Sequence, residues 1–403
     1  MPSEHVVRRR TVFYVSGFDP QGAARYHTLY HTEAQKQAKV SGQRIAVGER
    51  RTVTSGNPCW DLHSQVDTRD VETRYEFLRW DEIVRAHWPR SLPRLLVDVL
   101  VTTWFYLRTG ALMRMLRLSW PPFVALFAPF VLLMALLFAL PAVALAVFGV
   151  AVQPLGSVIG SILAMATFAV GLLLGRAAER RFSMLWLMRS YAFTARQARG
   201  LVPAMAPMVA RHATALAQRI AAAEDDEVLL VGHSSGAMVA ASILAHALRH
   251  DPMLGQKGPS VALLTLGQCF PMLGCLPQAD TLRQDLRLLA TASSISWIDF
   301  TAPPDGCCFA LVDPLAACGV PVQDRSSNRP KLLSPKFADM FAPDVYATLR
   351  KDKFRVHFQY LMASEQAVDY DYFAITAGAM TLGARYASHA SVDNYSALRP
   401  FGK

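Results

Sequence analysis

Charged residues are scarce in this 403-residue chain, at 18% of the total, and one long stretch has none. No Asp, Glu, Lys or Arg occurs from Leu118 to Gly175. That stretch is nearly three times the ~20 residues that one helix needs to cross the hydrocarbon core of a bilayer. A core helix of a soluble protein does not continue that far without a charge. The absence predicts an integral membrane protein.

Cysteine is also rare, and its spacing follows no pattern. No CxxC pair occurs together with a second pair or with histidines at zinc spacing, which argues against a disulfide framework and a structural zinc site. We expect reduced, mostly buried thiols in a reducing compartment, and no metal or cofactor. The cysteines are Cys59, Cys269, Cys275, Cys307, Cys308 and Cys318.

Basic residues are in excess, with a formal net charge of +10, but they are not arranged as in nucleic-acid-binding proteins. The basic triplet Arg8–Arg10 runs directly into a β-like segment, and no basic stretch is interleaved with aromatic residues. The expected partner is therefore the lipid bilayer, with its anionic head groups, and not nucleic acid. Arginines gather on both sides of the uncharged stretch: Arg108, Arg114 and Arg117 before it, and Arg176, Arg180 and Arg181 after it.

The uncharged stretch is long enough for two membrane spans. Its most polar, turn-like point is residues 153–157, which divides it into spans at Phe123–Val150 and Leu155–Leu174. The arginines lie on the outer flanks and none lies in the connecting loop, so the positive-inside rule places both flanks and both termini on the cytoplasmic side. The apolar run Thr11–Val15 is too short for a signal-peptide core. We predict a two-helix transmembrane hairpin in a cytoplasmic membrane of the bacterial type.

Two further features adjoin this hairpin. The segment Leu95–Leu118 mixes arginines with apolar residues, and Asp98 argues against a third span. It is either an amphipathic helix on the membrane surface or a helix that packs in the core. Gly171 and Gly175 form a GxxxG pair, which suits close helix contact. Aromatic residues that suit an interfacial belt are Trp104, Tyr106, Trp120 and Trp186.

Outside the hairpin, strand and helix patterns alternate. The acidic run Glu224–Glu227 is expected to be a solvated loop. Predicted strands are Thr11–Ser16, Arg44–Val53, Cys59–Val66, Arg74–Leu78, Val228–Val231, Val261–Leu266 and Ile295–Phe300. Predicted helices are Ala23–Val40, Leu201–Ala223, Ser234–Arg249 and Asp280–Leu289, with another beginning at Asp81. This alternation predicts an α/β fold with a mostly parallel sheet flanked by helices.

The most informative chemical motif is Gly-His-Ser-Ser-Gly at residues 232–236, which matches the pattern Gly-x-Ser-x-Gly around Ser234. An apolar strand leads into it and an amphipathic helix leads out. A nucleophilic serine on a tight strand-to-helix turn has a strained backbone, and the small residues two positions before and after it allow that turn. This context favours a nucleophile over the alternative, a glycine-rich turn capped by serine.

On this motif, and less strongly on the turn Ser16-Gly17-Phe18, the sequence resembles the α/β-hydrolase superfamily of lipase- and esterase-like serine hydrolases. The resemblance implies a triad in the chain order Ser, acid, His. It also implies an oxyanion hole made by the amide after the nucleophile and by an amide of an early strand–helix loop. Carried over to this chain, those amides belong to Ser235 and Phe18. The early loop departs from the glycine-rich HGGG run, and the hairpin stands where a soluble member has a helix.

The order of the triad leaves two candidates for each remaining member. Asp305, in the loop after the strand Ile295–Phe300, is preferred as the acid to Asp299 within that strand. His357 and His389 are the histidines that follow Asp305. His357 is preferred because it ends a strand-like run before a helix, whereas His389 lies in a serine-rich tail. The histidines that break the order are His27, His31 and His233.

The expected function is a membrane-anchored serine hydrolase that cleaves an ester or thioester, of a lipid or another amphiphile, by a Ser234–Asp305–His357 triad. An acyltransferase would use the same residues, and a non-catalytic membrane scaffold that keeps the fold for binding is the alternative. Residues 1–117 and 181–403 are expected to form one hydrolase domain, with the hairpin, residues 118–180, inserted between them.

Overall fold

The computed structural model describes residues 6–53, 55–66, 69–321 and 330–392, and within them the chain forms a nine-stranded sheet flanked by helices. The strand order is β2-β4-β5-β1-β6-β7-β8-β9, and β3 also pairs with β4. The run from β5 to β9 is parallel, whereas β2, β3 and β4 pair antiparallel, so the sheet is mixed but mostly parallel, as predicted. The strands are β1 Arg9–Val15, β2 Arg44–Val47, β3 Arg51–Thr52, β4 Pro58–Val66, β5 Arg69–Phe77, β6 Glu227–His233, β7 Ser260–Leu266, β8 Ile295–Phe300 and β9 Lys331–Leu333.

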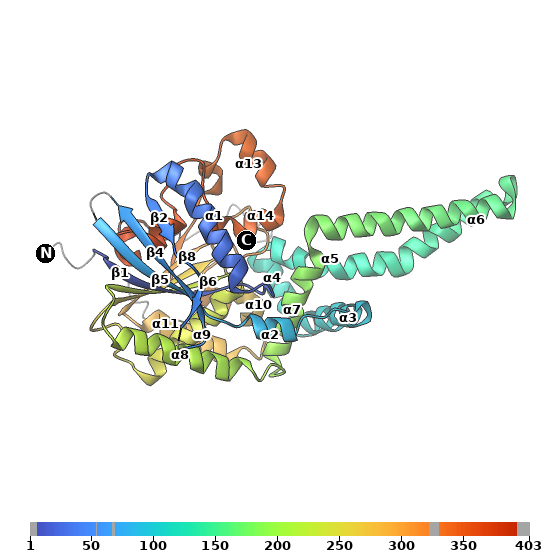
Figure 1. The fold of residues 1–403 in the computed structure, drawn as a ribbon. Helices are drawn as coiled ribbons and strands as arrows, with labels where there is room; N and C mark the ends of the chain where they lie inside the picture. Colours follow the sequence, from blue (N-terminus) through green and yellow to red (C-terminus); the bar gives the residue numbers. More distant parts are fainter. Residues whose placement is uncertain (1–5, 54, 67–68, 322–329, 393–403) are drawn as a thin grey trace.

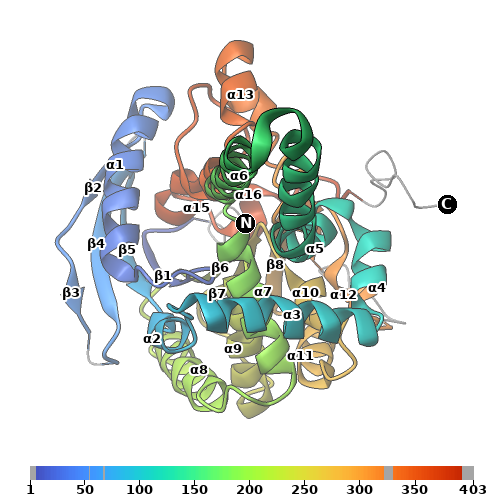
Figure 2. The ribbon, with the colours of Figure 1, turned by 90° about the vertical axis from the view of Figure 1, so that its right-hand side faces the viewer.

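The central strands separate two hydrophobic cores, because successive side chains of a strand point to opposite faces. On β6, Val228 and Leu230 belong to one core, and Leu229 and Val231 belong to the other. Helices α8, α9 and α11 cover the first face, and α1, α15 and α16 cover the second (Figure 2). These helices are α1 Ala23–Ser41, α8 Met205–Ala221, α9 Gly236–His250, α11 Asp280–Thr291, α15 Tyr372–Ala377 and α16 Leu382–Arg385.

Shorter helices surround the carboxyl ends of the parallel strands, where the candidate site lies. The two that matter for the site are α7 and α14. Their bounds, with those of the other short elements, are α2 Asp81–Ala86, α7 Met184–Ala198, α10 Phe270–Gly274, α12 Pro314–Ala317, η2 Phe337–Met340, α13 Pro343–Leu349, α14 Lys353–Phe358 and η3 Gln359–Leu361.

Two predicted strands in the N-terminal half have the wrong bounds. The predicted strand Arg44–Val53 is interrupted at residues 48–50, which separate β2 from β3. The predicted strand Arg74–Leu78 begins earlier, at Arg69. It does so because β4 and β5 form a continuous antiparallel ladder as far as Val66 opposite Arg69.

The acidic run Glu224–Glu227 is only in part the solvated loop that was predicted, because Glu224 and Asp226 are exposed but the other two carboxylates are buried. Glu227 is fully buried, and its carboxylate accepts hydrogen bonds from Arg10 Nε at 2.6 Å and from the Leu382 amide at 2.6 Å. Asp225 is also buried and pairs with Arg219. A buried ion pair needs such additional donors to offset its desolvation. Basic and acidic residues therefore join β1 to β6.

The apolar stretch forms a helical arm, Trp120–Phe182, that projects from the sheet domain (Figure 1). It consists of α5 Trp120–Met134, the π-helical turn η1 Ala135–Ala139 and α6 Leu140–Phe182. Gly156, inside the predicted turn, interrupts the helical backbone with φ +80° and ψ 165°, and the chain then returns beside its first half (Figure 1). The arm is one helical run that is long and apolar enough to cross a membrane.

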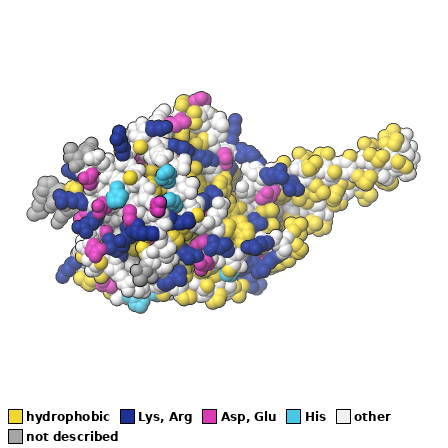
Figure 3. All heavy atoms as spheres, in the orientation of Figure 1, with side chains coloured by type: hydrophobic (Ala, Val, Ile, Leu, Met, Phe, Trp, Pro, Cys, Tyr) yellow, Lys and Arg dark blue, Asp and Glu magenta, His cyan; other side chains and the backbone are white. Residues whose placement is uncertain are grey.

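The two halves of the arm pack closely where Gly171 and Gly175 lie. A Cβ atom on Gly171 would come within 2.2 Å of the Leu140 side chain, and one on Gly175 within 3.1 Å of the Leu136 side chain. Hydrophobic side chains cover the length of the arm, and Lys and Arg side chains lie near its base (Figure 3).

Helices α3, Leu92–Arg108, and α4, Ala111–Leu118, precede the arm and meet at an angle of 79°. Helix α3 packs on the core, as one of the two interpretations predicts, because it buries Val99 there; Trp104 on its other face is 65% exposed. Two residues assigned to the interfacial belt lie elsewhere. Tyr106 is fully buried and donates to the Met272 carbonyl, and Trp186 is a half-buried residue of the candidate site.

Candidate active site

Ser234 stands at a sharp turn between β6 and α9. Its φ of +57° lies in the left-handed region, which strains a residue with a side chain. The flanking glycines are required by packing: a Cβ on Gly232 would lie 2.6 Å from Ala237 Cα, and one on Gly236 would lie 2.3 Å from the Ser16 carbonyl oxygen. The backbone thus holds the Ser234 side chain at the carboxyl end of the sheet, where ligands bind in open α/β folds.

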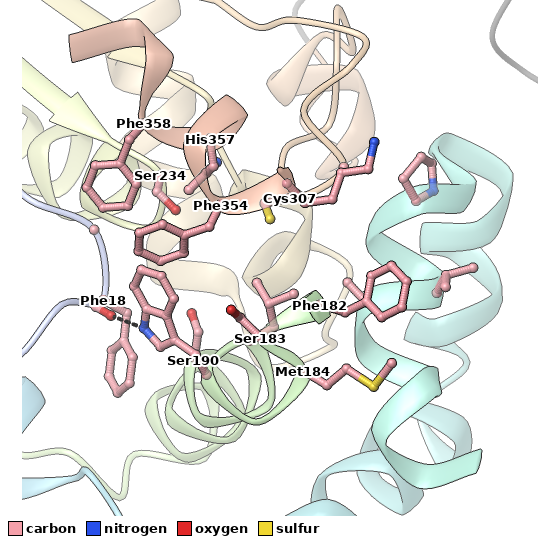
Figure 4. Close-up of a pocket in the computed structure, with 18 of the residues that line it drawn as sticks. Phe18, Phe182, Ser183, Met184, Ser190, Ser234, Cys307, Phe354, His357 and Phe358 are labelled. Carbon is pink, nitrogen blue, oxygen red and sulfur yellow. Dashed lines mark hydrogen bonds between the residues drawn. The ribbon is translucent and has the colours of Figure 1, made fainter. Parts of the chain in front are cut away.

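The loop after β1 lies against Ser234. A Cβ on Gly17 would come within 3.0 Å of Ser234 Cβ, so a larger residue here would have to displace Ser234 by a few tenths of an ångström. Trp80 Nε1 donates to the Ser16 carbonyl at 2.9 Å, and Trp186 Nε1 donates to the Phe18 carbonyl at 2.8 Å (Figure 4). Two indole groups therefore fix the backbone of the segment that carries the Phe18 amide.

The amides of Phe18 and Ser235, predicted as an oxyanion hole, belong to the two backbone segments that meet at Ser234. Among the described residues, neither amide donates a hydrogen bond to a protein acceptor. Unpaired amides beside a serine hydroxyl are suited to bind a developing oxyanion.

Asp305 and His357 lie together, as predicted. His357 Nδ1 is 2.9 Å from Asp305 Oδ2 and 3.1 Å from Oδ1. The carboxylate also accepts from the Cys307 amide at 3.0 Å and from the Tyr360 hydroxyl at 3.1 Å. Burial alone would raise the pKa of Asp305, but His357, the Cys307 amide and the Cys308 thiol lower it below the usual value. The carboxylate is therefore ionised and fixes the imidazole.

The local structure around His357 differs from the prediction. The residue lies in the short helix α14 and not at the end of a strand. The side chain of Asp352 caps this helix by accepting from the Arg355 amide at 3.0 Å, which is a strong helix-start signal. The helix directs His357 toward the Ser234 side of the cavity (Figure 4).

The alternative residues lie elsewhere. Asp299 is buried on β8 and accepts from Thr265 Oγ1 at 2.5 Å, and burial raises its pKa to about 7. His389 lies 3.6 Å from Asp369 and packs on Tyr386. His27 bonds the Gly48 carbonyl. Asp299, His389 and His27 do not line the cavity that contains Ser234 and His357.

His233 is a residue of the site that the sequence did not indicate. Its Nε2 lies 2.9 Å from the carbonyl of His357, which can only accept, so Nε2 carries the proton. Burial lowers its pKa to about 3, so the ring is neutral. The ring packs against that of His357 in a tilted arrangement, with centroids 4.9 Å apart and planes at 38°. His233 therefore holds the backbone and ring of His357 in place from the strand that precedes Ser234.

The Ser234 hydroxyl is not bonded to His357 in this structure. Within the described part of the chain its hydrogen-bond partner is Cys269 Sγ, at 3.8 Å. Catalytic hydrogen bonds are often long or misaligned without substrate, and Ser234 and His357 face one cavity (Figure 4).

That cavity has a volume of about 540 Å³ and a mostly apolar lining. The base of the arm forms one wall, and α7 and α14 form others. The lining includes Trp120, Pro121, Val124, Ala125 and Ala128 from α5; Met184, Trp186, Leu187 and Ser190 from α7; and Lys353, Phe354 and Phe358 from α14. A volume of this size suits a small-molecule site.

The six cysteines are free, and five of them are buried; Cys307 is half-buried. Asp305, Cys307 and His357 place three possible metal-ligand atoms within 4.8 Å of one another. The set fits a metal poorly. Nδ1 of His357 already contacts Asp305, and burial raises the pKa of the Cys307 thiol well above its usual value, which disfavours the thiolate that a metal needs.

Comparisons with protein-family models, curated proteins and solved structures found no match for this chain. The geometry of the site alone therefore bears on function.

Proposed function

We propose that this chain is a membrane-anchored serine hydrolase of the α/β-hydrolase superfamily, with Ser234, Asp305 and His357 as its triad. The observation that carries the proposal is the Asp305–His357 pair on the same cavity as a serine with a strained backbone. The order of the three residues along the chain is that of the superfamily. Residues 1–117 and 181–403 then form one catalytic domain, since β1 and β6 are adjacent strands of one sheet.

The reaction follows from the bonds of the site. Asp305 holds the proton of His357 on Nδ1, which leaves Nε2 free to act as the base. Ser234 Oγ attacks the ester carbonyl and its proton passes to Nε2. The carbon–oxygen bond to the alcohol then breaks, and the alcohol takes that proton. Water, activated in the same way, hydrolyses the acyl-serine, so one ester and one water give one acid and one alcohol.

The substrate class follows from the wall that the arm contributes. Val124, Ala125 and Ala128 present apolar surface to the cavity at the base of a segment suited to the bilayer. An ester or thioester with an apolar chain, drawn from the membrane, fits such a lining. An acyltransferase would replace the water with another alcohol at the same residues.

The topology belongs to the same proposal. Two spans that turn back at Gly156 place the sheet domain and both termini on the cytoplasmic side, where the arginines flank the arm. Reporter tags at both termini should be found in the cytoplasm, and a cysteine placed near Gly156 should be labelled from outside. An external terminus would refute the two-span topology.

A fluorophosphonate probe tests the chemistry, because it reacts covalently with a serine that a base has activated. We expect the wild type to be labelled, and Ser234→Ala and His357→Ala not to be. His389→Ala is the matched control and should be labelled as the wild type is. In a serine protease, loss of the base costs as much as loss of the nucleophile, about a millionfold in turnover. Full labelling of Ser234→Ala would exclude this site.

One observation favours a second candidate, a scaffold that uses the fold for binding. The Ser234 hydroxyl faces Cys269 and is not bonded to His357. A well-folded wild type that the probe does not label would support this candidate.

A further inference from the structure

A second cavity adjoins the catalytic one. It is an open cleft of about 490 Å³. It forms where the last residues of the arm, at its base, meet the loop after β8 and the segment between α13 and α14. Phe182, Pro304 and Lys353 line both the cleft and the catalytic cavity. A molecule that occupies both would therefore extend from the base of the arm to Ser234.

The cleft is strongly cationic. Arg181, Arg350, Lys351 and Lys353 line it, and no carboxylate does so among the residues that the structure describes. Over the same described residues, none of the four side chains takes part in an ion pair. Such a group of like charges is unfavourable unless an anion neutralises it.

The four cations come from parts of the chain that are far apart in sequence, and the fold holds them together. The Arg181 guanidinium donates to the Lys351 carbonyl, which joins the end of the arm to the segment after α13. Lys353 Nζ donates to the Arg350 carbonyl at 3.1 Å. The position of Arg181 is explained by the usual excess of arginines beside a membrane segment. That rule does not explain the three cations that a distant segment contributes.

We propose that this cleft binds the phosphate of an anionic membrane phospholipid while its acyl ester lies at Ser234. The proposal rests on the proposed hydrolase function and adds the substrate class. Arginine and lysine side chains bind phosphate through charge-assisted hydrogen bonds. The cleft lies at the base of the arm, where its last residues rejoin the sheet domain and where the head groups of a bilayer would be. The apolar cavity beside it accepts the acyl chain. Bilayer lipid is therefore the source of the phosphate.

The test compares lipids that share their acyl chains and differ in charge. Purified protein in mixed micelles is given phosphatidylglycerol or diacylglycerol, which lacks the phosphate, and kcat/KM is measured for each. We expect the wild type to prefer the anionic lipid, and Arg350→Gln/Lys351→Gln to lose about tenfold or more of that preference. The matched control Arg114→Gln/Arg117→Gln removes two arginines that do not line the cleft, and it should keep the preference. Melting temperatures check that both variants are folded.

Several results would overturn the proposal. They are equal rates on the two lipids, an unchanged preference in the cleft variant, and an equal loss in the control, which would indicate net charge alone. A short-chain phosphatidylglycerol, dissolved as a monomer and cleaved as fast as the micellar lipid, would overturn the bilayer source. If a fluorophosphonate labels Ser234 but no anionic preference exists, only the substrate class is wrong. Failure of both labelling and hydrolysis refutes the hydrolase function itself.

Discussion

Replacement of Asp305 by asparagine tests the site most sharply, because the structure determines which way the new amide must face. The Cys307 backbone amide donates to Oδ1 at 3.0 Å. A backbone N–H can only donate, so the position of Oδ1 must keep an oxygen. The amino group of the asparagine then takes the place of Oδ2, the carboxylate oxygen nearer to His357 Nδ1, at 2.9 Å.

An amino group at that position donates to His357 Nδ1 across the shorter contact, which favours an acceptor Nδ1 over the longer contact of 3.1 Å to Oδ1. The imidazole proton then moves to Nε2, the nitrogen that should take the proton of Ser234. The imidazole stays in place but has the wrong tautomer. In a serine-protease triad the same replacement lowers turnover on the order of ten-thousandfold, and a loss of that size is expected for Asp305→Asn.

The assay is the second-order rate constant for fluorophosphonate labelling, with hydrolysis of a neutral short-chain nitrophenyl ester as the second measurement. Asp299→Asn is the matched control. Like Asp305→Asn, this variant removes a buried carboxylate. The Asp299 carboxylate, near the end of β8, contacts Thr265 and not His357. A loss of less than about tenfold in Asp305→Asn, with the protein folded, would show that Asp305 does not orient the base.

Three further predictions concern stability, thiols and the cavity. The pKa of Asp299 rises from 3.8 to about 7 on folding, so ionisation of this carboxyl opposes folding. As the pH rises from 4 to 8, the free energy of unfolding should therefore fall, by at most about 4 kcal/mol. Asp299→Asn should therefore show a smaller fall in melting temperature over that range, and an equal fall would contradict this. The double variant Cys307→Ser/Cys308→Ser should keep most esterase activity, and a chelator should not change the activity of the wild type. Loss of bound metal or of activity in the variant would show that these thiols have a role. Ala128→Trp fills the cavity and should slow long-chain esters far more than short ones, whereas Val131→Trp, outside the cavity, should slow neither.

The strand-to-helix turn at Ser234 was predictable from the sequence because its signal is local. Strand, Gly-x-Ser-x-Gly and helix follow one another without a gap, and the strain at Ser234 arises within those residues. Asp305 was chosen by its place after a strand whose bounds, Ile295–Phe300, the structure reproduces. The apolar arm was equally plain, because an uncharged apolar run of that length is typical of helices that contact lipid.

Features that depend on distant contacts could not be predicted. The β-like pattern of residues 354–356 suggested a strand, whereas the packing of Phe354 on the distant Trp186 stabilises a helix there. The cap that Asp352 provides is local, and it is the one signal in the sequence that could have indicated this helix. The support that His233 gives to His357 requires a contact between residues 124 positions apart. The cationic cleft likewise joins Arg181 to residues 350–353, which no local pattern connects.

The base of the arm has a consequence for handling the protein. A tether joined by a linker can be cut away to release a water-soluble catalytic fragment. Here the residues from Trp120 to Ala128 belong to the apolar arm and also supply part of the lining of the cavity at Ser234, so excision of residues 120–182 would open that cavity to water. Solubilisation should instead replace outward-facing residues farther along, such as Leu145 and Leu173, which are 71% and 67% exposed, and leave the first turns of α5 unchanged.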